Sequence, residues 1–195
     1  MDLTSHLVAD GGDASIDHHP TLRSLTFQLQ IPEGEAEGQQ WSHKLYRRNH
    51  GQAVEVVYST TLNDSEQLAQ LFIGEEVLGF DMGWVYKPME PKWQATRLQE
   101  KVSVIQLAAE DKIGIFDVAR HVGKTTQQLI APTLQKIIED PGIVKTGVNI
   151  LNADFARLEK HFDLKPQGDM ELSHLHMLVT YRPDKPHRLY TSLVR

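Results

Sequence analysis

Two aspartates occupy positions at which a carboxylate could do chemistry. Asp81 ends the apolar run 77–80, and a carboxylate at the end of a buried strand is costly unless it is solvated, paired or bound to a metal ion. Asp154 lies near the border of an apolar stripe on a helix predicted over 151–162, where its side chain can face a cleft. Each has a plainer alternative, because Asp81 can simply meet water and Asp154 can favour the dipole of its helix.

The pattern around these residues predicts an α/β fold. Apolar runs rich in β-branched residues indicate strands over 53–59, 77–81, 102–109, 113–118 and 143–148. The polar residues 110–112 favour a tight hairpin between the third and fourth strands. At least part of the sheet should therefore be antiparallel.

Four helices are predicted from capping residues and apolar spacing. Their expected starts are, in chain order, Asn63 or Asp64, Pro132, Asn149 or Asn152, and Glu171. The side chains expected to face the core from these helices are Leu68, Leu71, Phe72, Leu134, Ile137, Ile138, Leu151, Phe155, Leu158, Phe162, Leu172, Leu175, Leu178 and Val179. The third helix carries the most regular stripe, and this regularity places Asp154 at the border of the buried face.

Residues 1–40 differ in composition from the rest of the chain. They include a Glu-, Gly- and Gln-rich run over 32–40, and low hydrophobicity of this kind favours disorder. We expect a mobile N-terminal tail over 1–40, followed by one domain over 41–195. The apolar patch 22–31 offers an alternative, in which it forms a strand or docks on that domain.

Composition limits the class of protein. The chain has 195 residues, enough for one domain with a hydrophobic core, and no cysteine, which excludes disulfides and thiolate metal sites. It has no apolar run of about 18 residues or more, and no secretory signal pattern. We expect an intracellular protein, in the nucleus or the cytoplasm, with no membrane partner. The net charge of −6 argues against a basic nucleic-acid-binding face, although metal ions bound by carboxylates reverse the local charge.

Several segments, taken in order, carry a family resemblance. They are Val77-Leu-Gly-Phe-Asp-Met-Gly-Trp84, Val104-Ile-Gln-Leu-Ala108, Ile115-Phe-Asp-Val118, Ile137-Ile-Glu-Asp-Pro-Gly-Ile-Val-Lys-Thr-Gly-Val148, and Asp154 with Leu158 behind it. In this order and spacing, the chain resembles the DEDD-type 3′–5′ exonuclease domain of the Werner helicase and RNase D kind. The resemblance covers about residues 53 to 180.

The resemblance implies a ribonuclease H-like α/β fold, with a mixed central β-sheet flanked by helices. It also implies hydrolysis of phosphodiester bonds in nucleic acid with two Mg²⁺ or Mn²⁺ ions. Asp81 and Asp154 would be the catalytic and metal-binding residues. The expected partner is single-stranded or 3′-end nucleic acid, either DNA or RNA.

Two parts of the family pattern are absent. The first motif has a glutamate where Gly83 stands, and the third motif, Tyr-x-x-x-Asp, is not found, since Lys185 and Val194 follow the two candidate tyrosines. The exonuclease-like domain is therefore predicted to be C-terminally incomplete, and the chain to be inactive or weak as a nuclease. One alternative is a non-catalytic module that binds nucleic acid or protein. Another is a fragment of a longer active gene product.

Basic and aromatic side chains offer further contacts. Lys44, Arg47 and Arg48 form one cluster, and Lys92, Arg97 and Lys101 form another. Either cluster can contact phosphates or simply face solvent. Trp84 can stack on a base or pack against the protein.

Overall fold

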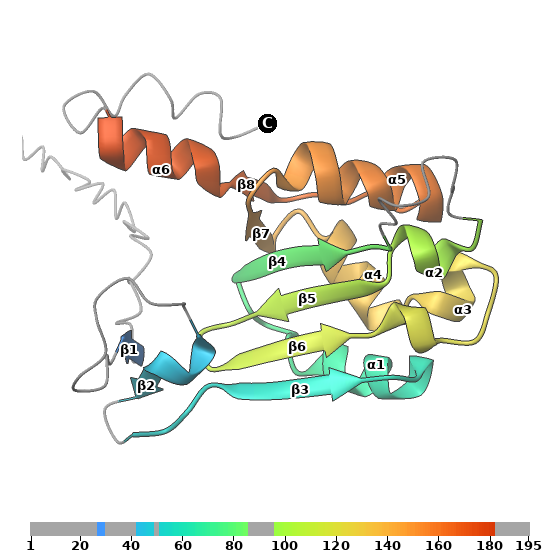
Figure 1. Cartoon of the computed structure of the whole chain (residues 1–195), viewed down its shortest axis with the longest axis horizontal. Coiled ribbons are helices and arrows are strands. Elements are labelled where there is room, and N and C mark those ends of the chain that lie inside the picture. The colour runs from blue at the N-terminus through green and yellow to red at the C-terminus, as the bar shows by residue number, and fades with distance from the viewer. Residues whose placement is uncertain (1–26, 30–41, 49–50, 86–95, 182–195) are drawn as a thin grey trace, which may run out of the picture.

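The computed structural model describes residues 27–29, 42–48, 51–85 and 96–181. Its centre is a six-stranded sheet in the order β3-β6-β5-β4-β7-β8 (Figure 1). The strands are β3 (Glu55–Ser59), β4 (Val77–Gly83), β5 (Val104–Ala108), β6 (Lys112–Phe116), β7 (Val144–Gly147) and β8 (Asp169–Glu171). A separate two-stranded ribbon pairs β1 (Phe27–Leu29) with β2 (Tyr46–Arg48).

The sheet is mixed, as predicted. β5 runs antiparallel to both of its neighbours, β4 and β6, whereas β3 pairs parallel with β6, and β7 pairs parallel with β4 and β8. The predicted hairpin between β5 and β6 is confirmed. β4 is thus the strand at which the antiparallel part of the sheet meets the parallel part.

Helices lie beside the sheet and at its β8 edge. They are α1 (Leu62–Gln70), α2 (Leu98–Lys101), α3 (Thr126–Leu129), α4 (Pro132–Glu139), α5 (Ala156–Phe162) and α6 (Leu172–Tyr181). Figure 1 shows α5 and α6 at the β7–β8 side, with α6 extending beyond the edge of the sheet. Across the ranges that the structure describes, no helix has both the length and the apolar character needed to cross a bilayer.

Alternation along β4 divides the sheet into two faces. Leu78, Phe80 and Met82 are buried in the core with side chains of α1 and α4. The intervening residues, from Gly79 to Gly83, project to the other face. On that face, Tyr58 of β3 and Val77 of β4 are 52% and 53% exposed. Asp81 therefore lies on the more open face of the sheet.

The helix predictions succeed where the spacing is regular and fail near helix ends. Leu134, Ile137 and Ile138 are buried on α4, as predicted, and Pro132 is its first residue. The spacing also predicts core positions for Leu71, Leu151 and Leu175, and this is wrong, since they are 49%, 46% and 42% exposed. The reasons differ: Leu71 follows the last residue of α1, and Leu151 lies in a π-helical turn. Leu175 lies on α6, the helix that extends beyond the edge of the sheet in Figure 1. The side chains of Leu178 and Val179 lie outside the described residues.

The start of α1 also differs from the prediction. Its N-cap is Thr61, with extended backbone, and not Asn63 or Asp64. The Thr61 hydroxyl accepts a hydrogen bond from the Asp64 backbone N–H at 3.1 Å, which satisfies one free donor of the first turn.

Most of the predicted N-terminal tail lies outside the described residues. Within 1–40, the structure describes only β1, which falls inside the apolar patch 22–31 and pairs with β2. The alternative interpretation of that patch, as a strand, therefore holds for Phe27–Leu29. The mobility predicted for the rest of 1–40 stays a prediction.

Lys145 is a fully buried cation on β7, the strand next to the β8 edge of the sheet. Its Nζ donates hydrogen bonds to the backbone carbonyls of Ile137, at 3.1 Å, and Asp140, at 2.6 Å, at the C-terminal end of α4. A positive charge is favourable there, because helix C-terminal carbonyls lack intrahelical partners. Burial nevertheless lowers the pKa of Lys145 to about 8.

Replacement of Lys145 by methionine should lower the free energy of unfolding by roughly 1–3 kcal/mol at neutral pH, because two buried carbonyls lose their donor. The free energy of unfolding of the wild-type protein should also rise as pH increases from about 8 to 10.5. In that range the unfolded chain keeps the Lys145 proton and the folded chain loses it, so the unfolded state binds more protons. Urea unfolding at several pH values measures both effects. Lys136→Met, on the exposed side of α4, is the control. Equal stability of the two variants would contradict the capping role.

Candidate functional site

Asp81 is exposed on β4 and is oriented by its neighbour across the sheet. It pairs in register with Gln106 of β5, and the Gln106 side-chain amide donates a hydrogen bond to Asp81 Oδ2 at 3.1 Å. Among the described residues, none donates a hydrogen bond to the second carboxylate oxygen, Oδ1, which can therefore bind a ligand on the open face. The plainer prediction, that Asp81 meets water, is thus compatible with a binding role.

Asp154 approaches from the turn after β7 and is only 4% exposed. It lies in a π-helical turn, Ile150–Phe155, that precedes α5. Burial, and then the charge of Asp81, raise the pKa of Asp154 to about 7; Arg157 opposes this rise and Glu171 adds to it. The structure therefore brings the two predicted site residues within electrostatic range of each other.

An aromatic contact fixes the turn against the strand. Phe80 and Phe155, which precede Asp81 and follow Asp154 in the sequence, meet edge to face with ring centroids 5.6 Å apart. Both rings are buried in the core. Because each aspartate is adjacent to one of these rings, the contact limits how far the two carboxylates can separate.

Glu171 is a site residue that the sequence prediction missed. It ends β8, is 8% exposed, and accepts hydrogen bonds from the backbone N–H groups of Asn149, at 2.8 Å, and Ile150, at 3.0 Å. It also accepts from the backbone N–H and the hydroxyl of Ser173. Burial alone would raise the pKa of Glu171, but these hydrogen bonds hold it below its ordinary value. Both carboxylate oxygens of Glu171 therefore bind the backbone of the turn that carries Asp154.

Gly83 lies on the same face of β4 as Asp81, two residues further on. A Cβ atom placed on it would have Val104 Cβ as its nearest neighbour, at 3.8 Å, which is an ordinary van der Waals distance. A side chain therefore fits at position 83. What is missing there is the ligand atom and not the space for it.

The donor set fits one divalent ion better than two. Among the described residues, no group of three or more histidine, cysteine, aspartate or glutamate side chains is arranged to hold a metal ion. Asp81 and Asp154 are two carboxylates, and Mg²⁺ is often held by one or two carboxylates with water in its remaining positions. Burial, and then the negative charge of Asp81, raise the pKa of Asp154, and a bound cation would offset the second of these effects. A close pair of ions would need further acidic ligands.

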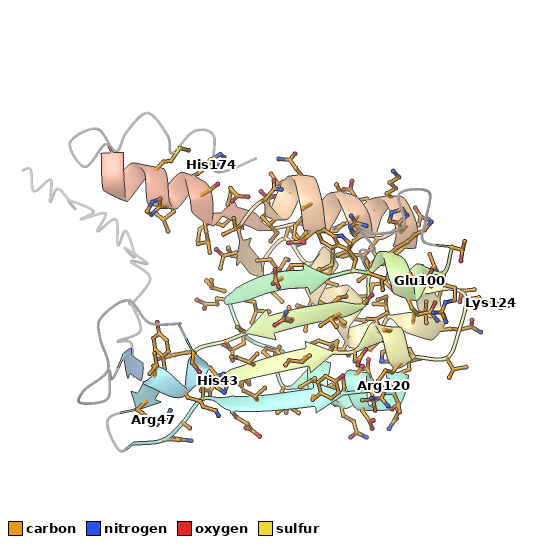
Figure 2. The ribbon with its side chains drawn as sticks, viewed as in Figure 1. His43, Arg47, Glu100, Arg120, Lys124 and His174 are labelled. Atoms are coloured by element: carbon orange, nitrogen blue, oxygen red, sulfur yellow. The ribbon has the colours of Figure 1, made fainter. Side chains whose placement is uncertain are left out.

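The predicted basic clusters are separated in space. Figure 2 shows His43 and Arg47 near β2, at one end of the molecule, and Glu100 of α2 at the opposite end. Arg97 pairs with Glu100 at 3.3 Å, and Lys92 lies outside the described residues. Of the second cluster, Lys101 lies on the α2 side facing α5, where Arg157 Nη1 donates to its carbonyl at 3.4 Å.

Trp84 directly follows β4 and is 38% exposed. The Arg157 guanidinium carbon lies 3.9 Å from the centroid of its ring, which is a close cation–π contact. Trp84 thus packs on one side against α5 while part of its surface faces solvent.

Comparison with known proteins identifies the fold. No protein-family model matches the chain. No curated protein matches it either. Crystal structures of the EXD2 exonuclease domain do match: one has a TM-score of 0.50 and 24% identity, and covers 64% of this chain and 60% of that one. A crystal soaked in Mn gives 0.50 and 25%, with coverage of 63% and 59%, and a crystal soaked in Mg and dGMP gives 0.50 and 24%, with 65% and 63%.

These matches confirm the predicted ribonuclease H-like fold with a mixed central sheet flanked by helices. The sheet has six strands. The chain spans about three fifths of the length of the EXD2 domains that it matches. The likeness establishes the exonuclease fold. The DEDD subtype stays a prediction, as do the roles of Asp81 and Asp154.

Asp154→Asn should change how stability depends on pH. The folded-state pKa of Asp154 is raised from 3.8 to about 7, so the folded wild-type protein holds a proton that the unfolded chain has lost between these values. Wild-type stability should therefore fall by a few kcal/mol as pH rises from about 4 to 7, and the variant should lack this part of the slope. Thermal unfolding across this range measures the effect. Glu159→Gln, exposed on α5, is the control. Parallel pH profiles for wild type and Asp154→Asn would contradict the buried-acid interpretation.

Glu171→Gln should loosen the turn that carries Asp154. A glutamine amide offers one acceptor oxygen and one NH₂ group, so at least one of the Asn149 and Ile150 N–H groups would lose its acceptor. We expect a loss of about 1–3 kcal/mol in the free energy of unfolding and faster hydrogen exchange at these two amides. Ser173→Ala removes a single hydrogen bond to the same carboxylate and should leave both amides protected. Unchanged exchange in Glu171→Gln would show that the turn holds its shape without this carboxylate.

Proposed function

We propose that this chain is an exonuclease-fold domain of the DEDD 3′–5′ type whose metal-binding set is incomplete. In this proposal, Asp81 and Asp154 hold a single Mg²⁺ or Mn²⁺ ion beside the 3′ end of a single strand of DNA or RNA. Hydrolysis with this set is weak or absent. The observation that carries the proposal is the convergence of two carboxylates beside Gly83, a position with room for a side chain but no ligand.

Comparison with solved structures supports the choice of ligands. EXD2 exonuclease domains with a TM-score of 0.50 have been crystallised and soaked in Mn, in Mg, and in Mg with dGMP. We carry these ligands over to this chain as a divalent cation and a nucleotide end. DNA and RNA ends remain equal candidates.

Gln106 and Asp154 have different roles at the proposed cation site. Gln106 holds one oxygen of Asp81, so the carboxylate keeps a fixed orientation toward the open face. With a pKa of about 7, Asp154 is partly protonated near neutral pH and must lose that proton to bind a cation, so cation binding should strengthen as pH rises through about 7. A bound divalent ion would supply Lewis-acid stabilisation of charge on a phosphodiester.

Gly83 limits the reaction on electrostatic grounds. Two divalent ions held close together repel, and several carboxylates are needed to offset that repulsion. Without the glutamate of the family pattern, the site should lose several kcal/mol of transition-state stabilisation, which is a rate loss of roughly 10³-fold or more.

The alternative function is a module that binds nucleic acid without cleaving it. It is favoured by the lack of a three-ligand metal group among the described residues. Binding of single strands that persists in chelator, with neither Mn²⁺ binding nor cleavage by the purified protein, would support this alternative. Mg²⁺- or Mn²⁺-dependent trimming of 3′ ends by the purified wild-type protein would overturn it.

Gly83→Glu is the direct test of the incomplete metal set. The added carboxylate would project on the same face as Asp81, and we expect Mn²⁺ affinity to rise by about tenfold. Gly83→Gln adds the same bulk without the charge and is the matched control. Isothermal titration with Mn²⁺ measures affinity, and a 3′-labelled single-strand assay with DNA and RNA measures cleavage. Equal Mn²⁺ affinity in the two variants would show that position 83 does not face the cation.

A further inference from the structure

The exposed side of Trp84 and the basic residues around α5 lie next to the aspartate pair. Arg157 connects them, because its guanidinium stacks on Trp84 at 3.9 Å and its charge acts on Asp154, three residues earlier. Arg157 also donates to the Lys101 carbonyl at the end of α2. A continuous line therefore runs from the carboxylate site, over the Trp84–Arg157 stack, to the C-terminal end of α2.

Three cations act on His161, which lies on α5. Burial lowers the pKa of His161 on α5, and the positive charges of Lys101, Arg157 and Lys160 lower it further. These charges are thus close enough to act on a single imidazole. Glu100 is the nearest acid in the sequence on α2, and it is occupied by Arg97 and by the backbone N–H groups of Thr96 and Arg97.

The donors on this surface are not fully used. Arg157 Nη1 makes one long hydrogen bond, and its Nε is buried without a hydrogen-bond partner among the described residues. Lys160 is exposed and Lys101 is half-buried. Trp84 offers part of a flat aromatic ring at the end nearest the aspartates. Proteins bind single-stranded nucleic acids through two such features, which are cations spaced along the path of the strand and an aromatic ring on which a base can stack.

We propose that Trp84, Arg157, Lys101 and Lys160 form a track for the backbone of a single-stranded nucleic acid whose end lies at Asp81 and Asp154. The inference rests on the proposed function, because it names the path of the strand at the same site. Trp84 stacks on a base near the end, and the cations of α2 and α5 contact the phosphates that follow. The track acts through charge and stacking, so it binds without a divalent cation.

The test is the binding of a short fluorescent single strand in chelator, measured by anisotropy over a range of salt concentrations. The double variant Lys101→Gln/Lys160→Gln should weaken binding about tenfold, and the slope of log affinity against log salt should fall by about 0.7 for each phosphate that the variant no longer neutralises. The matched control is Lys136→Gln/Lys165→Gln, which removes the same charge from two exposed lysines near the end of α4. An equal loss of affinity in both double variants would overturn the track.

Trp84→Phe supplies a second measurement that depends on position and not on charge. Binding of the strand should quench tryptophan fluorescence in the wild type, and most of this quenching should disappear in the variant. Undiminished quenching in Trp84→Phe would place the strand elsewhere. An absence of strand binding in chelator would also overturn the track. Neither result tests the cation site at Asp81 and Asp154, because that site is measured by Mn²⁺ titration without nucleic acid.

Discussion

The carboxylate of Glu171 is the group on which the geometry of the site depends. It accepts two backbone hydrogen bonds from the start of the turn that carries Asp154, across a sequence separation of 22 and 21 residues. The turn needs this support, because Asn149 has a positive φ of 58° and the following residues form a π-helical turn. Both conformations are uncommon, although asparagine tolerates the left-handed region better than most residues. The buried carboxylate of Glu171, at the end of β8, thus stabilises an uncommon backbone conformation that places Asp154 beside β4.

Close approach of the backbone at Gly147 makes the same turn possible. A Cβ atom at Gly147 would lie 2.6 Å from the carbonyl oxygen of Phe80, so only glycine allows β7 to approach β4 this closely. Asp81 and Asp154 are then held beside each other by the sheet on one side and by the Phe80–Phe155 contact on the other. The result is a site with fixed geometry and unbalanced charge, which a proton on Asp154 balances only in part.

The sequence predicts those parts of this arrangement that depend on local periodicity. The strand ending near Asp81, the stripe of Leu134, Ile137 and Ile138, and the hairpin of β5 and β6 all follow from residue spacing within one element. The two acids could be proposed from their places at element ends and from the family resemblance. Their shared electrostatics needed the structure, because a raised pKa depends on burial and on neighbours from other strands.

What could not be predicted arises from contacts between distant segments. The spacing assigns Leu151 to a buried α-helical stripe, but the π-helical turn rotates it outward and buries Ile150 in its place. Glu171 looks like the first residue of a helix, and no pattern in the sequence links it to Asn149. The stack of Arg157 on Trp84 likewise joins a helix to the end of a strand far earlier in the chain. In each case the structure depends on a tertiary contact, which local sequence propensity cannot predict.

The position of β4 in the sheet has a consequence for the kinetics of folding. β5 and β6 form a local hairpin, whereas β4 meets β7 only through pairs such as Val77 with Val144, and β7 must then pair with β8. Pairing between strands so distant in sequence closes large loops and tends to come late. The repulsion between Asp81 and Asp154 is therefore absent from early compact states and is imposed only on the finished sheet. A cation that relieves it would act mainly by slowing unfolding, leaving the rate of folding almost unchanged.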